Sequence, residues 1–307
     1  MSDNSIRGFR KNNGEVVLQS SPDSGLERLC SVRRDGIWSA KPEAGVERIE
    51  AVFRGQGFSP HRHDTYAIGL TMRGVQRFMY RGEERASLAG QVIVLHPDEM
   101  HDGGAGTETG LHYRMIYVPP EHISEALQDT ANGRLPFVRE AILADHRFRK
   151  CLIEALLDMD QDMGPLKRAG VISDLAHCLE LFSDSRTGRS QALHWPAIRQ
   201  CAAYLRENTT ASVDVADLET LSGLDRFSLA RQFRAAFGTS PHRYLVMRRL
   251  EAVKAALAAG ETLAGTAITC GFSDQSHMTR HFKRAFGMPP GKWQRLGAAG
   301  ATSHNHG

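Results

Sequence analysis

The chain has 307 residues and a formal net charge of +3, with 38 Lys and Arg against 35 Asp and Glu, and this length is sufficient for two domains that each bury a core. Its five cysteines include no Cys-x-x-Cys pair, which argues against a zinc finger and against a disulfide framework. The sequence contains no signal-peptide core and no run of about 18 apolar residues, so we expect a cytoplasmic protein with reduced thiols and no membrane partner.

The first part of the chain has the pattern of a β domain. Residues 1–24 are polar and are expected to form a flexible arm. Residues 25–120 contain short β-rich segments, and strands are predicted around 28–33, 46–53, 65–72, 75–80, 91–95 and 111–117. Arg73-Gly74 and Tyr80-Arg81-Gly82-Glu83 are predicted to form hairpin turns between them. This spacing of strands and turns is typical of a small antiparallel barrel or sandwich.

Residues 121–183 have helical periodicity. Apolar side chains recur every three or four residues over Asp145–Asp160 and again over Leu166–Ser183, with Met163-Gly164-Pro165 between the two segments. This pattern predicts a helical hairpin packed on the β domain, and the alternative is a surface for self-association. Residues 184–193 are polar and are expected to be an interdomain linker.

Residues 194–296 contain the same helix-turn-helix pattern twice. In the second copy, Gly271 suits the end of one helix, and Ser273 or Asp274 can cap the next. Each copy has a buried stripe, and the two stripes are separated by 49 residues: Leu229, Phe233 and Phe237, then Met278, Phe282 and Phe286. We therefore predict two copies of one DNA-reading unit in a single chain.

The region between and around these copies supports DNA binding. Residues 194–296 carry 14 Lys and Arg against 8 Asp and Glu, so the basic excess falls on this part of the chain. Tyr244–Ala259 contains strong helix formers and predicts a linking helix of about 24 Å. Such a helix could separate two recognition helices by roughly one turn of DNA, about 34 Å. Residues 297–307 are expected to be a disordered tail.

This layout resembles the AraC/XylS family of bacterial transcription regulators over residues 194–296. The resemblance implies that two sets of residues face the bases: Phe227, Ala230 and Arg231 in the first unit, and Gln275, Ser276, Thr279 and Arg280 in the second. It also implies that Arg234 and Lys283 lie near the phosphate backbone. Gly265 and Thr266 depart from the family pattern, so the first helix of the second unit is expected to be weak.

The segment HRHDTYAIGLTMRGVQRFMYRG, followed by LAGQVIVLHPDEMH, resembles the cupin-type ligand-binding domain of such regulators. The implied fold class is α+β and multidomain. It has an N-terminal cupin-like antiparallel β-barrel with a helical hairpin, and a C-terminal all-α domain with two helix-turn-helix units joined by a long helix. The candidate effector-binding residues are His61, His63, Tyr66, Tyr80 and His101, with Arg77, Tyr113 and Arg114 as further pocket candidates.

Two interpretations of the three histidines stay open. His61, His63 and His101 stand at the intervals that metal-binding cupins use, and three imidazoles can bind Zn²⁺, Fe²⁺ or Ni²⁺. However, Ala67 and Ile68 stand where such cupins have an acidic ligand. We therefore favour histidines that hydrogen-bond an organic ligand or one another, and we expect no metal, no other cofactor and no catalytic residue.

The predicted function is a sequence-specific DNA-binding transcription regulator, controlled by a small-molecule effector in the N-terminal barrel. Its expected partners are double-stranded DNA, the effector, RNA polymerase and a second copy of the chain. One alternative is a metal-dependent cupin enzyme tethered to DNA, and another is a DNA-binding protein without an effector. The sequence does not identify the effector, the operator or the direction of regulation.

Overall fold

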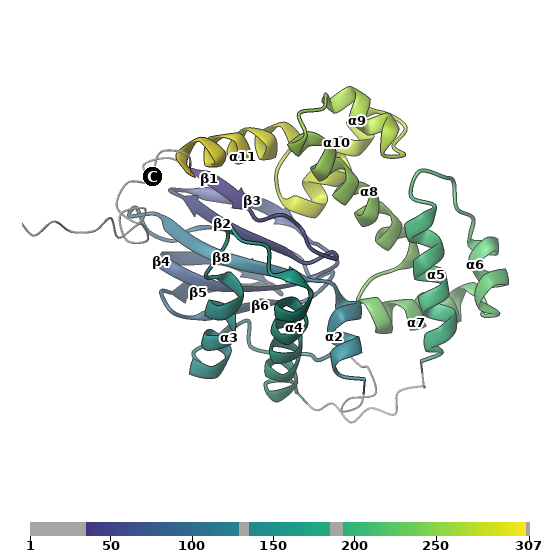
Figure 1. Ribbon diagram of the computed structural model, residues 1–307, viewed down its shortest axis with the longest axis horizontal. Coiled ribbons are helices and arrows are strands. Elements are labelled where there is room, and N and C mark those ends of the chain that lie inside the picture. Colours follow the sequence, from purple (N-terminus) through teal and green to yellow (C-terminus); the bar gives the residue numbers. More distant parts are fainter. Residues whose placement is uncertain (1–34, 129–134, 185–192, 305–307) are drawn as a thin grey trace, which may run out of the picture. The chain divides into compact units, whose positions relative to one another are not determined.

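The computed structural model describes residues 35–128, 135–184 and 193–304 (Figure 1). The predicted arm at 1–24, the predicted strand at 28–33 and most of the predicted linker lie outside these ranges.

The β domain is an antiparallel sheet, as the sequence predicts. Within the described residues it has nine strands, which are β1 (Gly36–Ser39), β2 (Glu47–Phe53), β3 (Gln56–His61), β4 (Tyr66–Tyr80), β5 (Glu83–Leu88), β6 (Val92–Leu95), β7 (His101–Ala105), β8 (Leu111–Val118) and β9 (Ile142–Leu143). One row of strands runs β1-β2-β8-β4-β6-β9, and β4 also pairs with β5 and β7. The long strand β4 therefore belongs to both parts of the sheet.

The hairpin predicted at Arg73-Gly74 is wrong. Strand β4 continues through both residues, pairing with β6 and β8 in its first half and with β5 and β7 in its second. The register shifts between Thr71 and Arg73, and Gly74 has a φ of +78°. The glycine therefore marks an irregularity where the strand passes from one group of neighbours to the other, which is a common role of glycine inside a strand.

The second predicted turn is confirmed. Arg81 and Gly82 connect β4 to β5, and both have positive φ angles, of 52° and 81°. Two consecutive residues with positive φ are the signature of the tight turn that matches the twist of an antiparallel pair.

Side chains of alternating strand residues enter two different cores, because successive residues point to opposite faces of a sheet. One core joins the sheet to helices α2 (Pro120–Ala126), α3 (His146–Leu156) and α4 (Gly164–Leu181), and it includes Ile68, Ile116, Phe148 and Leu175. The other core includes Ala67, Phe78 and Met115. The apolar stripes of α3 and α4 are thus buried within the chain, as the helical-hairpin interpretation predicts.

The C-terminal part is helical. It consists of α5 (Trp195–Glu207), α6 (Val215–Ser222), α7 (Arg226–Phe237), α8 (Pro241–Ala258), α9 (Leu263–Thr269), α10 (Gln275–Phe286) and α11 (Pro290–His304). The predicted linking helix corresponds to α8. Helix α11 extends to His304, into the segment where a disordered tail is predicted. No helix among the described residues has both the length and the apolar character to cross a membrane.

Substitution of Gly74 tests the close approach of β4 to the Gly110 carbonyl. A Cβ atom at Gly74 would lie 2.0 Å from the Gly110 carbonyl oxygen, whereas one at Gly82 would meet nothing within 4 Å. Both residues have positive φ. We expect Gly82→Ala to cost about 1 kcal/mol of unfolding free energy from backbone strain alone, and Gly74→Ala to cost about 3 kcal/mol or more. Urea unfolding of the two variants measures the difference, and equal costs would contradict the proposed close approach.

Candidate functional site

The two predicted recognition helices are α7 and α10, and each is capped by an aspartate. The carboxylate of Asp225 accepts from the backbone N–H groups of Phe227 and Ser228, at 3.0 and 3.1 Å. The carboxylate of Asp274 accepts from the backbone N–H of His277 at 2.7 Å. These bonds satisfy N–H groups that have no partner inside the helix, so they fix where each helix begins.

The predicted DNA-contact residues lie on the outer faces of these helices. The buried stripes hold α7 and α10 against their neighbours through side chains that are no more than 2% exposed, such as Phe233, Phe237, Met278 and Phe282. The predicted contact residues are exposed or half-exposed: Phe227, Ala230, Arg231, Arg234, Gln275, Ser276, Thr279, Arg280 and Lys283. Phe227 is 70% exposed, and an aromatic side chain at such a position is available to contact a base.

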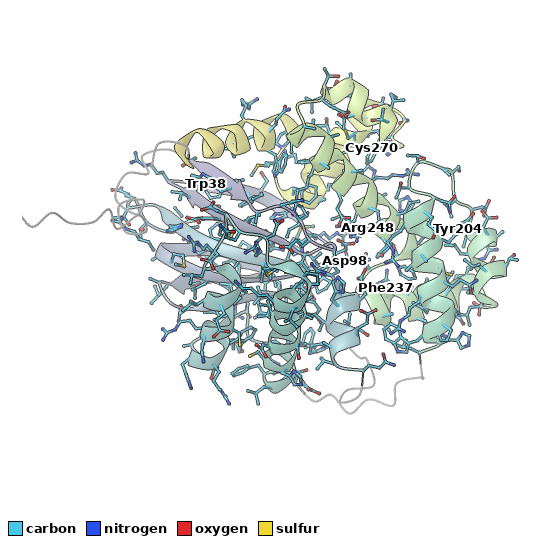
Figure 2. All side chains as sticks on the ribbon, viewed as in Figure 1. Trp38, Asp98, Tyr204, Phe237, Arg248 and Cys270 are labelled. Carbon is cyan, nitrogen blue, oxygen red and sulfur yellow. The ribbon has the colours of Figure 1, made fainter. Side chains whose placement is uncertain are left out.

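Helix α8 is attached to the β domain by ion pairs. Arg248 and Asp64 are 2.7 Å apart, and both side chains are buried. Arg243 forms a second pair with Asp98, at 2.7 Å, and Lys254 forms a third with Glu47. Figure 2 labels Arg248 and Asp98 at this junction. The sequence analysis did not single out any of these residues, although Asp64 directly follows the predicted His61–His63 pair.

Glu251 completes the charge arrangement around Arg248. Its carboxylate lies 2.9 Å from the Arg248 guanidinium, which therefore lies between two acidic groups. Burial raises the pKa of Glu251 to about 8, against the opposing effect of Arg248. Burial alone would lower the pKa of Arg248, but the negative charge of Asp64 raises it. Arg248 is therefore cationic, and Glu251 is largely protonated at neutral pH.

A cavity of about 60 Å³ lies beside this junction. Residues of the sheet line one part of it, including Ile49, Phe58 and Tyr117, and residues of the DNA-binding helices line another, including Met247, Phe286 and Trp293. Its polar lining includes His61, His63, Asp64, Glu251 and Lys254. A mostly apolar surface with a few polar groups is typical of small-molecule sites.

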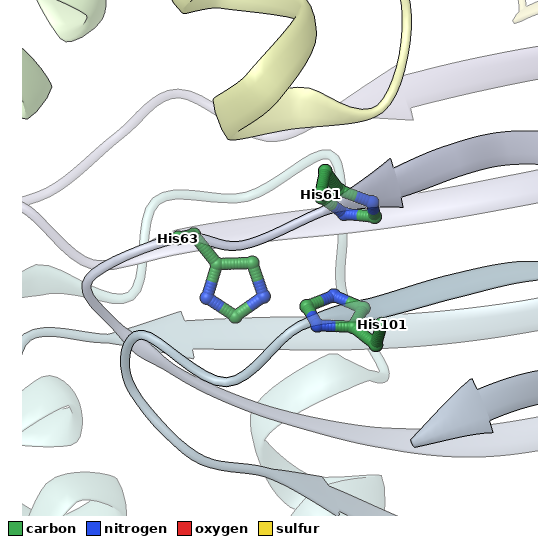
Figure 3. Close-up of side chains that lie close together, drawn as sticks. All are labelled: His61, His63 and His101. Atoms are coloured by element: carbon green, nitrogen blue, oxygen red, sulfur yellow. The ribbon is translucent and has the colours of Figure 1, made fainter. Parts of the chain in front are cut away.

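The three predicted histidines lie close together (Figure 3), and His61 and His63 line the cavity. The ring centroids of His61 and His101 are 4.2 Å apart, and those of His63 and His101 are 4.8 Å apart. One ring nitrogen from each residue lies within 4.8 Å of one from each of the others, so the group could hold a metal ion. Burial lowers the pKa of His61 to about 3 and that of His101 to about 4, and it lowers that of His63 well below its usual value. All three rings are neutral at physiological pH.

The remaining predicted effector contacts are not part of the cavity lining. The Tyr66 hydroxyl donates to the Pro136 carbonyl at 2.8 Å, in the core that faces the helices. The Tyr80 hydroxyl accepts from the His96 backbone N–H at 3.3 Å. The structure thus places Tyr66 on the opposite face of the sheet from the histidines, as a shift of one residue in strand parity does. Tyr80 lies in the other core and is the strand partner of His101 in the pairing of β4 with β7.

The further pocket candidates are also not part of the cavity lining. Arg77 is on the surface and pairs with Glu84, while Arg114 pairs with Glu50 at 2.9 Å. Tyr113 is buried in the core that contains Met115.

Comparison with known proteins agrees with this arrangement. The family model described as an AraC-like ligand binding domain matches residues 43–176, and a helix-turn-helix domain model matches residues 220–296. The chain belongs to the AraC family of transcription regulators. It has the ligand-binding domain and the helix-turn-helix DNA-binding domain of that family.

Individual relatives of this AraC-family chain span most of its length. It is 27% identical over 235 residues to the uncharacterised HTH-type regulator YbfI of Bacillus subtilis, covering 75% of this chain and 86% of YbfI. It is 24% identical to the transcriptional activator RhaS of Pectobacterium carotovorum, covering 76% of this chain and 86% of RhaS. A crystal structure of ToxT from Vibrio cholerae matches with a TM-score of 0.55 at 12% identity, covering 86% of this chain and 98% of ToxT. This last likeness supports the fold.

The raised pKa of Glu251 predicts a pH dependence. An unfolded glutamate has a pKa of about 4.3, so the folded chain holds a proton that the unfolded chain has lost between about pH 4.3 and 8. The stabilisation from this group is full below pH 4.3 and is lost as the pH rises through 8. We expect Glu251→Gln to be more stable than the original chain by about 1–3 kcal/mol at pH 8.5, with a smaller difference at pH 5.

Chemical denaturation at a series of pH values measures this difference. Glu261→Gln, which changes an exposed glutamate, is the matched control and should leave the pH profile unchanged. A Glu251→Gln profile parallel to that of the original chain would show that Glu251 is ionised in the folded state.

Proposed function

We propose that this AraC-family regulator binds a sequence-specific DNA site, and that a small molecule in the cavity beside α8 controls the binding. The observation that carries this proposal is the composition of the cavity wall. Side chains of the β domain, such as Ile49 and Tyr117, face the same space as Phe286 of the recognition helix α10 and Trp293 of α11. One ligand can therefore contact both parts of the chain.

Contact with both parts makes the ligand a regulator for a thermodynamic reason. A ligand shifts a conformational equilibrium only when it binds the two states with different affinity. A molecule bound between Tyr117 and Phe286 loses one set of contacts if α10 moves away from the sheet. Its affinity therefore depends on the position of α10, and linkage requires the ligand to affect that position in return.

The small volume of the cavity strengthens the dependence of ligand binding on the position of α10. A volume of about 60 Å³ has room for only a few water molecules. A larger effector must separate some of the lining residues as it enters. Binding and rearrangement of the junction then become a single event, and the Asp64–Arg248 and Glu47–Lys254 pairs are the contacts that such a rearrangement would disturb.

Carboxylic acids are the first effector class to test. ToxT has been crystallised with an unsaturated fatty acid and with (E)-4-(8-methylnaphthalen-1-yl)but-3-enoic acid. In this chain, Lys254 is a cation on the cavity wall, and the nearby apolar side chains of Phe286 and Trp293 suit a hydrocarbon body. An entering carboxylate would compete with Glu47 for Lys254.

The remaining parts of the proposal concern partners and location. We propose a cytoplasmic regulator that acts on RNA polymerase and forms a homodimer, rather than an enzyme. The relatives named above are transcription regulators, which supports a regulatory role. The main apolar stripes of α3 and α4 are already buried within the chain, so a dimer would use the exposed apolar residues of this region, including Leu157 (61%), Leu166 (88%) and Leu181 (58%).

Two substitutions test whether Arg280 reads a base and Lys283 contacts the phosphate backbone. We expect Arg280→Ala to cost about 1–3 kcal/mol of binding free energy at one base pair and to relax specificity there. Lys283→Ala should weaken binding to all sequences alike and lower the salt slope by about one unit. Fluorescence anisotropy with operator and point-mutated duplexes, over a range of salt concentrations, measures both effects. Equal losses on every sequence for the two variants would overturn these roles.

Effector control is tested by a thermal-shift screen that includes the two acid classes named above. A ligand held only by the folded chain raises the melting temperature. We expect at least one such ligand to change the affinity for specific DNA, and Ile49→Trp, which fills the cavity, to abolish both responses. Ile153→Trp, at an exposed position on α3, is the control. Ligands that stabilise the chain without changing its DNA affinity would leave the regulatory proposal without support.

A further inference from the structure

The three buried histidines are arranged in a way that binding of an organic effector alone does not explain. The side chains of His61, His63 and His101 are 6%, 4% and 5% exposed. His61 is the last residue of β3, His63 follows it, and His101 begins β7, which pairs with β3 directly at His61 and His101. The backbone pairing of two strands therefore brings the three rings together, as Figure 3 shows.

Hydrogen bonds fix the tautomer of each ring. The Nδ1 atoms of His61, His63 and His101 lie 2.9 Å from the backbone carbonyl oxygens of Ser59, Thr65 and Glu99. A carbonyl oxygen only accepts, so each Nδ1 must carry the proton and donate it. The lone pair of each ring is then on Nε2. Histidines that ligate metals have this same arrangement, with the second ring nitrogen donating to a carbonyl or carboxylate.

This tautomer rules out one part of the second interpretation of the histidines, in which the rings hydrogen-bond one another. Three Nε2 atoms with lone pairs are all acceptors, so the rings cannot hydrogen-bond one another through these atoms. Among the residues that the structure describes, the buried Nε2 atom of His63 has no hydrogen-bond partner. A buried polar atom without a partner costs about 1–3 kcal/mol. The cluster thus presents converging electron pairs that a bound cation would satisfy.

We infer that His61, His63 and His101 bind a divalent transition-metal ion, with Zn²⁺ as the reference ion. Neutral imidazoles suit Zn²⁺, Cu²⁺, Fe²⁺ and Ni²⁺, and three protein ligands with one open position form an accessible site. Because His61 and His63 line the cavity, we expect the open position on that side. A water molecule or a donor atom of a small molecule would occupy it.

The geometry requires only a small adjustment. Tetrahedral Zn–N bonds of about 2.0–2.1 Å place ligand nitrogens about 3.3 Å apart. The histidine nitrogens lie within 4.8 Å of one another, so the largest approach needed is about 1.5 Å. Rotation of the rings about their side-chain torsions supplies such a movement. Strand β4 contributes no acidic ligand, because Ala67 and Ile68 occupy the corresponding positions.

The site is also connected to the end of the recognition helix. Gly287 caps α10 in the left-handed conformation, and a Cβ atom there would lie 2.7 Å from Nδ1 of His61. The backbone N–H of Ser59 donates to the Gly287 carbonyl at 2.8 Å, and that of Arg62 donates to the Arg284 carbonyl at 3.1 Å. An ion that fixes His61 and His63 would therefore order the segment against which the last turn of α10 rests.

Metal binding by the tag-free full chain tests this inference without DNA or effector, so its outcome is independent of the proposed function. After removal of bound metal with a chelator, Zn²⁺ is titrated by calorimetry and Co²⁺ by visible absorption. All chains carry His304→Gln and His306→Gln, which remove the histidines of the C-terminal segment. We expect one equivalent of tightly bound metal, a Co²⁺ spectrum of low coordination number and a higher melting temperature.

Variants locate the ion. We expect His63→Gln and His101→Gln each to weaken Zn²⁺ binding by more than about 100-fold, because loss of even an outer-shell partner costs 10–100-fold. The control is the double variant His277→Gln and His281→Gln. It removes another close histidine pair, with Nε2 atoms 3.0 Å apart on α10, and it should retain the site. Tight binding that is lost in this control but kept in His63→Gln would overturn the inference, as would the absence of tight binding in the original chain.

A substitution that keeps a metal-binding side chain at position 101 distinguishes loss of the metal site from misfolding. His101→Cys offers a thiolate in place of an imidazole, so we expect bound Co²⁺ to gain a sulfur-to-metal charge-transfer band in the near ultraviolet. A bound Co²⁺ spectrum that does not respond to this substitution would show that His101 is not a ligand. Near-ultraviolet circular dichroism confirms that each variant is folded.

Discussion

The buried ion pair between Asp64 and Arg248 is the contact on which the proposed coupling of effector binding to DNA binding depends. The two groups are 2.7 Å apart, with side-chain exposures of 2% and 9%. Neither charge would be stable in this environment without the other, because an isolated buried ion carries a desolvation cost of several kcal/mol. Asp64 is adjacent to His63 in the sequence, and Arg248 is in the middle of the helix that joins the two helix-turn-helix units. The pair therefore connects the end of the sheet that carries the histidines and the cavity to helix α8, which contacts both α7 and α10.

The arrangement around this pair also explains why the junction can respond to small changes. Arg248 has two carboxyl partners, Asp64 and Glu251, and burial makes it unfavourable for both to be ionised. The cavity lies against the same residues, so a ligand that brings its own polar groups changes the charge balance as well as the packing. Packing and electrostatics thus act on one small region. A rearrangement there does not need to cross the rest of the β domain to reach α8.

The sequence predicted those features that depend on local patterns. The recognition helices, their aspartate caps and their buried stripes follow from helical periodicity and capping residues, and the Arg81-Gly82 turn follows from its residue types. The hairpin at Arg73-Gly74 was predicted wrongly, because a glycine inside a continuous strand gives the same local signal as a turn. The three histidines were correctly grouped from their spacing. Their tautomer was not predictable, since it depends on carbonyl groups of Ser59, Thr65 and Glu99 whose directions are set by the folded loops.

Ion pairs between residues far apart in the sequence could not be predicted from local patterns, for the same reason. Asp64 and Arg248 are separated by 184 residues, and nothing in either local sequence marks it as one half of a pair. The misplaced Tyr66 shows a related difficulty, because strand parity decides between two cores that are both apolar.

The position of Gly287 has a consequence for how this chain can change by mutation. This residue ends α10, the predicted recognition helix, and its backbone also contacts the strand segment that carries His61. Any side chain introduced there would press on an imidazole and on the Ser59 carbonyl, and it would also strain the left-handed helix end. In the proposed function, effector binding and operator recognition therefore both depend on Gly287, and a substitution there would affect both. Variants with a new effector preference should arise from other parts of the cavity wall, where a substitution leaves the end of the helix in place.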